Sequence, residues 1–219
     1  MNLWAVIPSR DRPGLLADLV STLVSDNVNV VVIDTGYEPP WGTYHGKVTT
    51  LRDTTQPPNI SRWWNLGLDY AQRIEGGNEH VVAVLNDDVI VPKGFVQRLA
   101  VFITTQDAVA AYPDQHDYFI GKGGCLKHTV AEPVSLYTRM CGYAFALRGS
   151  ARLRADEKLE WWYGDDDLDW RARQAGGSVL VGGLKVQHVS PNSTTIGELA
   201  AQTGRDRQTF INKWGRAPW

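Results

Sequence analysis

The sequence predicts an α/β domain with a mostly parallel sheet and helices on both of its faces. Uninterrupted apolar runs alternate with segments whose apolar residues recur at helical spacing. Because the runs lack an alternation of apolar and polar residues, the strands are expected to be buried on both sides, as in parallel sheets. The length of 219 residues, with 43% hydrophobic and 21% charged residues, suits one globular domain.

The N-terminal part of the chain alternates strand and helix. An apolar run at 3–7 ends at Pro8, and apolar residues at helical spacing follow over 15–24. A second run at 28–33 stops at Asp34 and leads into a loop rich in proline and glycine. These segments predict two strands joined by a helix.

The same alternation continues beyond this loop. A short strand is expected near 48–51, and the segment 60–74 predicts a helix that the pair Gly76-Gly77 ends. The run HVVAVL at 80–85 is a further strand, and Pro92 suits the first turn of a helix that continues to residue 102.

From Ala108 the pattern becomes irregular, and long loops in a compact domain are more often functional than idle. For this part we expect a glycine-rich loop at 121–128 and a strand at 137–148. A helix should start in the aspartates at 165–167 and end at Gly176, followed by short strands at 178–181 and 185–189. The tail at 196–215 is predicted to be helical, with a break at Gly204 as an option.

Bulk properties exclude several classes of protein. No segment reaches the roughly 18 consecutive apolar residues of a membrane span, and the N-terminus lacks the regions of a secretory leader, so we expect a cytoplasmic protein. Cys125 and Cys141 have no metal-ligand spacing and suit a reducing compartment. The formal net charge of −2 provides no overall attraction to nucleic acid.

Polar residues follow three of the predicted strands. Ser9 and Arg10 follow the first, Asp34 ends the second, and the triplet Asn86-Asp87-Asp88 follows the strand at 80–85. Ligands of open α/β sheets bind at the carboxyl ends of the strands, so these side chains are expected to converge.

The triplet Asn86-Asp87-Asp88 is unusual at the end of a buried strand. Asn and Asp often form turns or cap helices, but three apolar residues separate the triplet from Pro92, so capping fits poorly. Adjacent carboxylates repel each other unless a cation or hydrogen-bond donors compensate, and oxygen ligands beside a diphosphate suit Mg²⁺ or Mn²⁺. The triplet therefore predicts a divalent metal site.

A second acidic cluster, Asp165-Asp166-Asp167, opens a predicted helix. Acids in this position complement the helix dipole and can pair with arginines one turn later. Three in succession after the aromatic segment 161–163 instead favour a carboxylate beside a sugar-stacking wall, where it could act as a general base. His188 ends a short strand, and a lone histidine is more often a satisfied surface or core residue than a ligand.

Taken in order, these segments resemble a family 2 type nucleotide-sugar glycosyltransferase with the Rossmann-like GT-A fold. The segments that carry the resemblance are VIPSRDRPGLLADLVSTL, VVVIDTG, RWWNLGLDYA, LNDDV at the place of the DxD motif, YGDDDLDWRARQAG as the acidic motif, QHVS and FINKWG. No single motif is specific, but their order and spacing extend over nearly the whole chain, least clearly between Ala108 and Leu136.

The resemblance implies a role for each candidate residue. The base and ribose of the donor would be held by Pro8, Ser9, Arg10 and Asp34, with help from Arg62 and Asn65. The ribose and phosphates would be lined by Asn86 and Asp87. The Mn²⁺ or Mg²⁺ that bridges the diphosphate would be bound by Asp88, with His188 completing its shell. The catalytic base would be Asp165, with Asp166 as the alternative.

This sequence also departs from the family pattern. Asn86 replaces the commoner first Asp of the DxD motif, which weakens a two-carboxylate chelate. Gly164 stands where the family usually has Glu before its catalytic Asp, so the register within 165–167 is open by one residue. Thr35 replaces a frequent second Asp after the second strand.

The expected organisation is a single glycosyltransferase domain, with a nucleotide-sugar-binding half at 1–107, an acceptor and catalytic half at 108–195 and a C-terminal helix at 196–219. The expected activity is a metal-dependent hexosyltransferase that moves a sugar from UDP-sugar or another nucleoside diphosphate sugar to a hydroxyl acceptor. The acceptor could be a glycan, a protein side chain or a modified nucleic-acid base. Because one base and no covalent nucleophile are expected, transfer should invert the anomeric carbon.

Two other functions remain as alternatives at this stage. One is a nucleotide- or glycan-binding domain without activity. The other is a metal-dependent phosphohydrolase with Asp34 as nucleophile, although Gly36 stands where that chemistry needs a second Asp. A dinucleotide-dependent oxidoreductase is disfavoured, because no GxGxxG follows the first strand.

Overall fold

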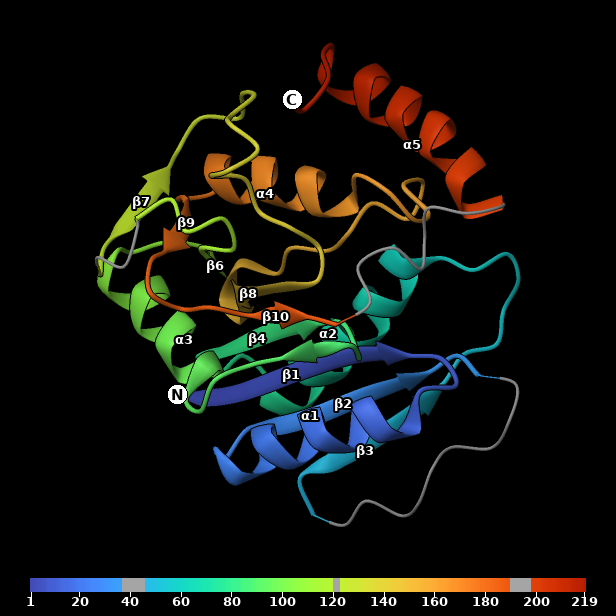
Figure 1. Ribbon diagram of the computed structural model, residues 1–219, viewed down its shortest axis with the longest axis vertical. Coiled ribbons are helices and arrows are strands. Elements are labelled where there is room, and N and C mark those ends of the chain that lie inside the picture. The colour runs from blue at the N-terminus through green and yellow to red at the C-terminus, as the bar shows by residue number, and fades with distance from the viewer. Residues whose placement is uncertain (37–45, 120–122, 190–197) are drawn as a thin grey trace.

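The computed structural model describes residues 1–36, 46–119, 123–189 and 198–219. It confirms the predicted α/β class, with helices on both faces of a large, mostly parallel sheet (Figure 1). Parts of three predicted segments lie outside the described residues. They are most of the Pro- and Gly-rich loop after Asp34, the first two residues of the glycine-rich loop, and the first two residues of the C-terminal helix.

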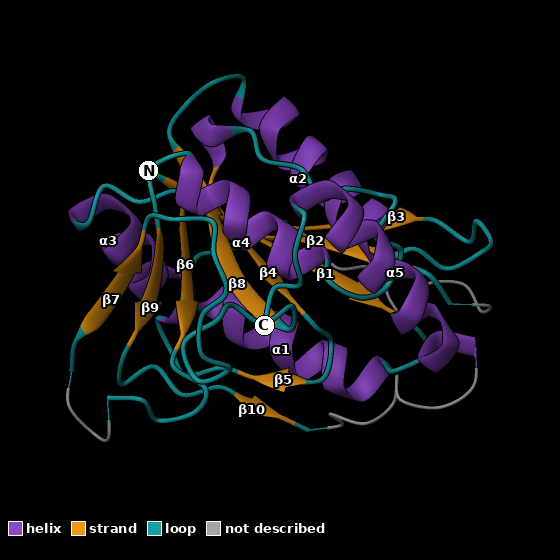
Figure 2. Ribbon diagram, turned by 90° about the horizontal axis from the view of Figure 1, so that it is seen from above, coloured by secondary structure: helices purple, strands orange, loops and turns teal. Residues whose placement is uncertain are grey.

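Among the described residues, the main sheet has the strand order β3-β2-β1-β4-β8-β6-β9-β7. Its strands are β1 (Asn2–Ser9), β2 (Asn29–Asp34), β3 (Val48–Arg52), β4 (His80–Leu85), β6 (Ala110–Pro113), β7 (Cys125–His128), β8 (Ala144–Arg148) and β9 (Ser178–Val181). The helices are α1 (Pro13–Ser25), α2 (Ile60–Glu75), α3 (Phe95–Thr105), α4 (Gly164–Gln174) and α5 (Glu198–Trp214). A separate antiparallel pair consists of β5 (Val89–Ile90) and β10 (Gln187–His188) (Figure 2).

The direction of the strands decides which loops meet. β3, β2, β1 and β4 are parallel, and Ser9 at the end of β1 lies opposite Asp34 at the end of β2. β8 is antiparallel to β4, and its first residue, Ala144, lies opposite Leu85, the last residue of β4. The loop that leads into β8 therefore lies at the same edge as the carboxyl ends of the parallel strands.

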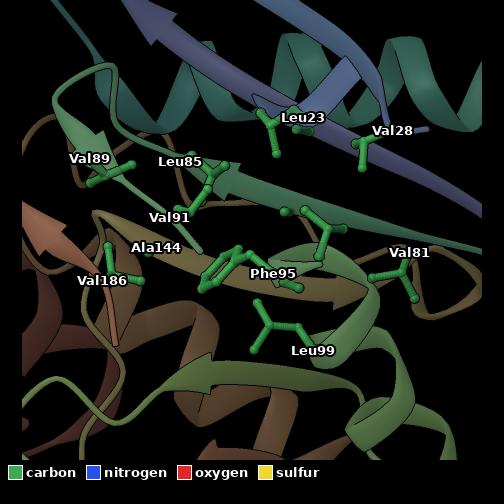
Figure 3. Close-up of a cluster of buried hydrophobic side chains, with 14 of the residues drawn as sticks. Leu23, Val28, Val81, Leu85, Val89, Val91, Phe95, Leu99, Ala144 and Val186 are labelled. Atoms are coloured by element: carbon green, nitrogen blue, oxygen red, sulfur yellow. The ribbon is translucent and has the colours of Figure 1, made fainter. Parts of the chain in front are cut away.

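The sheet is buried under two helix layers. α1 and α3 cover one face with an aliphatic cluster, and α2 and α4 cover the other with a cluster that includes Trp63, Trp64 and Phe145. β5 and β10 are anchored on the first cluster, because Val89, Val91 and Val186 pack with its core residues (Figure 3).

α5 packs outside α4 (Figure 1). Its Phe210 is fully buried against Tyr163 and Trp170. The carboxylate of Asp167 in α4 accepts a hydrogen bond from Trp214 Nε1 at 2.9 Å and pairs with Lys213 at 2.8 Å. An apolar contact and a buried charge thus fix the C-terminal helix on the domain.

Several predicted boundaries are confirmed and others shift. α2 begins after Asn59, whose side chain accepts a hydrogen bond from Arg62 N, and it ends at Gly76 in the left-handed conformation, as predicted. α3 begins at Phe95 rather than at Pro92, because Gly94 takes a left-handed conformation with φ of 73°. α5 continues through Gly204 without a break.

The strand predicted at 137–148 is formed only over Ala144–Arg148. β4 has already ended opposite the earlier residues, so they have no neighbouring strand and form a loop instead. The strand predicted at 185–189 is likewise limited to Gln187–His188, which is as long as its partner β5. Among the described helices, none has both the length and the apolar character that crossing a bilayer requires.

The close contact of α2 with β1 gives a test of the packing. A Cβ added to Gly67 would lie 2.3 Å from the Val6 side chain, so Gly67→Ala forces the helix and strand apart. We expect a loss of about 1–3 kcal/mol in the free energy of unfolding, measured by urea denaturation. Gly14→Ala in α1 is the matched control, since nothing lies within 4 Å of its added Cβ. An equal loss in the control would contradict this packing.

Candidate functional site

The end of β4 holds a network of charges. Asp87 accepts hydrogen bonds from Ser9 Oγ at 2.9 Å and from Arg12 Nη1 at 3.2 Å. The same Nη1 donates to Asp88 at 2.7 Å. Burial raises the pKa of Asp87, and the hydrogen bond from Ser9 and the charge of Arg12 only partly oppose this rise. One guanidinium therefore serves two adjacent buried carboxylates.

His188 approaches the same network from the other half of the chain. Its Nε2 lies 3.1 Å from Asp88 Oδ1, and β10 holds it there because His188 pairs with Val89, the residue after Asp88. Tyr143 stacks on the imidazole ring with a centroid distance of 4.6 Å. Burial acts to raise the pKa of Asp88, but His188 and Arg12 outweigh it, so the pKa is lowered and Asp88 remains a carboxylate at neutral pH.

Ser9, Arg12, Asp87 and Asp88 line a pocket of about 250 Å³ at the end of the parallel strands, which we name the strand-end pocket. Its walls are formed by Pro8, Ser9, Arg10, Arg12, Thr35, Ile60, Trp63, Asn86, Asp87, Asp88, Trp161 and Leu199. The pocket thus joins the ends of β1, β2 and β4 with the first turn of α2, the loop before α4 and the start of α5.

Three of the residues that the sequence predicted to bind the donor do not line the strand-end pocket. Asp34 pairs with Arg52 at 3.1 Å and accepts a hydrogen bond from Gly36 N. Arg62 pairs with Asp53 at 2.9 Å. Asn65 is buried and exchanges hydrogen bonds with the backbone of Ala155. The side chains of Asp34, Arg62 and Asn65 therefore bind other groups of the protein. These contacts hold the segments around the strand-end pocket.

A second pocket of about 540 Å³ adjoins the first, and we name it the aspartate pocket. It shares Ile60, Asn86 and Trp161 with the strand-end pocket. Its other walls are Trp64, Arg139, Cys141, Gly142, Tyr143, Trp162, Tyr163, Asp165, Asp166, His188, Thr203 and Trp219. The two candidate bases and the Asp88–His188 pair therefore face one continuous hollow.

Asp165 and Asp166 are held in different ways. Backbone N–H groups of the first turn of α4 and of Gly142 act on the Asp165 carboxyl group and oppose the rise of its pKa. Asp166 instead pairs with Arg139 at 3.3 Å. Burial raises the pKa of Asp166 well above its usual value, and the charge of Asp165 adds to the rise. Burial also raises the pKa of Asp165, against the charge of Arg139 and the backbone donors. The adjacent carboxyl groups thus resist carrying two full negative charges.

Asp167 and Cys141, which lie near these two aspartates, are not candidate bases or nucleophiles. Asp167 is fully buried among Trp214, Lys213 and Arg171, so it ties α4 to α5 and does not reach the pocket. Burial raises the pKa of Cys141 to about 12, so its thiol stays protonated and is a poor nucleophile.

The wall between the two pockets is held by Asp206 of α5. This fully buried carboxylate accepts hydrogen bonds from the backbone amides of Glu160, Trp161 and Trp162 at 3.2, 2.9 and 2.8 Å. Trp162 Nε1 also donates to Leu199 O at 2.7 Å. α2 holds the other side of the loop, where Ile60 N donates to Glu160 O at 2.7 Å. Two helices therefore orient Trp161.

Sequence reasoning missed Arg12, Arg139 and Asp206. Arg12 had a visible signal, since SRDRPG follows the first strand with two arginines. Arg139 lies in a segment that the sequence assigned to a strand. Asp206 had no signal, because it stands between two arginines in an amphipathic helix and resembles a solvated charge.

The residues present offer few protein ligands for a divalent cation. Asp88 and His188 offer one carboxylate and one imidazole. In the part of the chain that the structure describes, no group of three or more His, Cys, Asp or Glu side chains converges to hold a metal ion. The fit therefore requires that most other ligands be phosphate oxygens and water, as is usual for Mg²⁺ at nucleotide sites.

We compared the chain with known protein families, sequences and structures. No protein-family model and no curated protein sequence matches this chain. Among solved structures, it is similar to S. aureus TarS residues 1–349 in complex with UDP, with a TM-score of 0.62, 13% identity, and coverage of 99% of this chain and 72% of that chain. It is also similar to a longer S. aureus TarS structure, with a TM-score of 0.60, 12% identity, and coverage of 99% and 44%. The chain thus spans less than half of that longer protein. Its fold is that of the part of TarS with which it aligns.

The hydrogen bonds of Asp206 generate a stability prediction. Asp206→Ala leaves three amides of the tryptophan loop without their acceptor, so we expect a loss of about 2–4 kcal/mol in the free energy of unfolding. The control is Asp156→Ala, which removes another contact to α5, the 2.7 Å pair with the partly exposed Lys213, and should cost less than about 1 kcal/mol. Similar losses in urea denaturation of the two variants would contradict the role of Asp206.

Proposed function

We propose that this chain is an inverting, metal-dependent glycosyltransferase of the family 2 type with a GT-A fold. It would transfer a sugar from a nucleoside diphosphate sugar to a hydroxyl acceptor. The observation that carries this proposal is the pair of adjoining pockets. Asp88 lines one pocket, Asp165 and His188 line the other, and the Asp88–His188 contact joins the two beside a shared wall that includes Asn86 and Trp161. The likeness to a UDP complex of TarS supports the same reading.

The strand-end pocket would take the nucleoside diphosphate. Pro8, Ser9 and Arg10 lie beside the triplet Asn86-Asp87-Asp88. This position suits a nucleotide, because it lies at the carboxyl ends of the neighbouring strands β1 and β4, at the topological switch point of the sheet. Asp88 and His188 would hold Mn²⁺ or Mg²⁺, which supplies positive charge for the diphosphate when bound. Asp34, Arg62 and Asn65 would act by shaping the edge, because their side chains bind protein groups.

The aspartate pocket would take the acceptor. Asp165 would remove the proton from the attacking hydroxyl, whose oxygen forms the new bond to the anomeric carbon while the bond to the diphosphate oxygen breaks. The backbone N–H groups around Asp165 favour its ionised form. Asp166 would hold Arg139 in place rather than take the proton, because the two are ion-paired.

Inversion follows from the number of available nucleophiles. A double displacement needs a second side chain that attacks the anomeric carbon from the opposite face. Asp166 is engaged by Arg139, and the raised pKa of Cys141 keeps its thiol protonated. A single displacement by the acceptor is therefore the reaction that these groups support.

Two alternatives remain to be tested against this proposal. A phosphohydrolase with Asp34 as nucleophile is disfavoured, because Arg52 pairs with this carboxylate away from the strand-end pocket. A binding domain without activity would bind the same nucleotide and release nothing. The acceptor hydroxyl would belong to a glycan, a protein or a modified nucleic acid.

The first test measures release of nucleoside diphosphate. The chain is incubated with a panel of nucleoside diphosphate sugars and Mn²⁺ or Mg²⁺, with and without EDTA. We expect release from one donor class that EDTA abolishes and that falls at least about 10²-fold in Asp88→Ala, since the leaving charge is then poorly stabilised. Binding of a donor with no release under any condition would favour the inactive binding domain.

A second test separates the two candidate bases. Asp165→Asn should lower kcat by about 10²- to 10⁴-fold and leave donor affinity intact. Asp166→Asn should act mainly through Arg139 and lower kcat less. Since burial raises the pKa of Asp165, the wild-type rate should fall on acidification at a pH above the usual range of an aspartate. A larger loss of kcat in Asp166→Asn than in Asp165→Asn would reverse the assignment.

A further inference from the structure

Arg12 has a fixed place at the mouth of the strand-end pocket. It is the N-cap of α1, and its carbonyl oxygen accepts the first hydrogen bond of that helix from Leu16 N at 3.1 Å. The preceding residue, Asp11, takes a left-handed conformation with φ of 53°, which turns the chain before the helix begins. The backbone of Arg12 is thus held by the start of a helix.

Only part of the Arg12 guanidinium is used by the protein. Its Nη1 donates to both Asp87 and Asp88, whereas its Nε and Nη2 have no hydrogen-bond partner among the described residues. The side chain is 32% exposed, against 2% for that of Asp88, and it lines the pocket. Arg12 therefore joins buried carboxylates on one side to the open pocket on the other.

The charges of the site explain why such a bridge is needed. Two adjacent carboxylates repel a diphosphate. Among the residues that the structure describes, Asp88 and His188 are the candidate protein ligands of the divalent cation. A guanidinium is a planar donor with five N–H groups that can bind a phosphate through two parallel hydrogen bonds. It also stays charged at any physiological pH.

We propose that Arg12 binds the diphosphate of the donor, with Nε and Nη2 donating to its oxygens. This inference rests on the proposed function for the identity of the ligand, a nucleoside diphosphate. In the free protein Arg12 compensates the charge of Asp87 and Asp88, and in the complex it offers its other donors to the phosphates. It competes with a divalent cation for the Asp88 carboxylate and assists that cation in holding the leaving group.

The experiment measures binding rather than turnover. UDP, GDP and ADP are titrated into the wild type, Arg12→Ala, Arg12→Lys and the control Arg98→Ala, with Mn²⁺ and with EDTA, by calorimetry. Arg98 is exposed on α3 and lines neither pocket. For the diphosphate that the wild type prefers, Arg12→Ala should lose about 10- to 100-fold in affinity. Arg12→Lys should recover part of this loss, and Arg98→Ala should match the wild type.

Two further measurements separate phosphate binding from a purely structural role. The parent nucleoside without phosphates should bind the wild type and Arg12→Ala equally, because its affinity does not depend on the guanidinium. Without nucleotide, Mn²⁺ followed by electron paramagnetic resonance should bind Arg12→Ala more tightly than the wild type, because a competing positive charge is gone. A general loss of structure would instead weaken all three ligands.

The outcomes distinguish this inference from the proposed function. Equal diphosphate affinity in the wild type and both Arg12 variants overturns the role of Arg12 while the proposed function stands. Equal losses for the diphosphate and the parent nucleoside also overturn it. If no nucleoside diphosphate binds the wild type, the proposed function fails, and the role of Arg12 fails with it. If Arg12→Ala does not fold, the comparison of Arg12→Lys with the wild type decides, with a loss of affinity expected.

Discussion

The site depends on the reversal of strand direction between β4 and β8. β4 ends at Leu85, β8 starts opposite it at Ala144, and Asn86 N continues the contact by donating to Tyr143 O at 2.9 Å. Parallel strands would have carried the second half of the chain to the far end of the sheet. The reversal instead joins the loops of the parallel strands to the loop before β8, and the two pockets meet at that junction.

Both pockets solve the same electrostatic problem in the same way. Each contains two neighbouring aspartates that burial deprives of water, and each pair is compensated by one partly exposed arginine, Arg12 in one case and Arg139 in the other. Burying two neighbouring carboxylates away from water costs free energy, because each negative charge loses hydration and repels the other. A single guanidinium lowers this cost and leaves the carboxylates available to a ligand. His188 adds to this compensation only at Asp88. The two aspartate pairs therefore differ in the charge around them, which agrees with the separate roles that we propose for them.

Much of the fold and part of the site could be predicted from the sequence. Apolar runs and capping residues such as Asn59 and Gly76 are local signals, so the strands and helices of the parallel half were predicted closely. The placement of His188 beside Asp88 could be anticipated only from the resemblance of ordered motifs, because a two-residue strand leaves almost no pattern. Arg12 and Asp206 depend on side-chain direction and on long-range backbone partners, which composition and spacing do not encode. The late start of the strand predicted at 137–148, which begins only at Ala144, depends likewise on its neighbour β4.

The buried contact of α5 with the tryptophan loop has a consequence for biosynthesis. Asp206 and Phe210 belong to α5, and Asp206 holds the backbone of Trp161, which lines the strand-end pocket together with Pro8 and Ser9 near the N-terminus. Domains acquire structure as they leave the ribosome from the N-terminal side. The sheet can form while α5 is still in the exit tunnel, but the hollow around Trp161 cannot. A nascent chain therefore holds an open, incomplete cleft until α5 emerges and packs on the tryptophan loop.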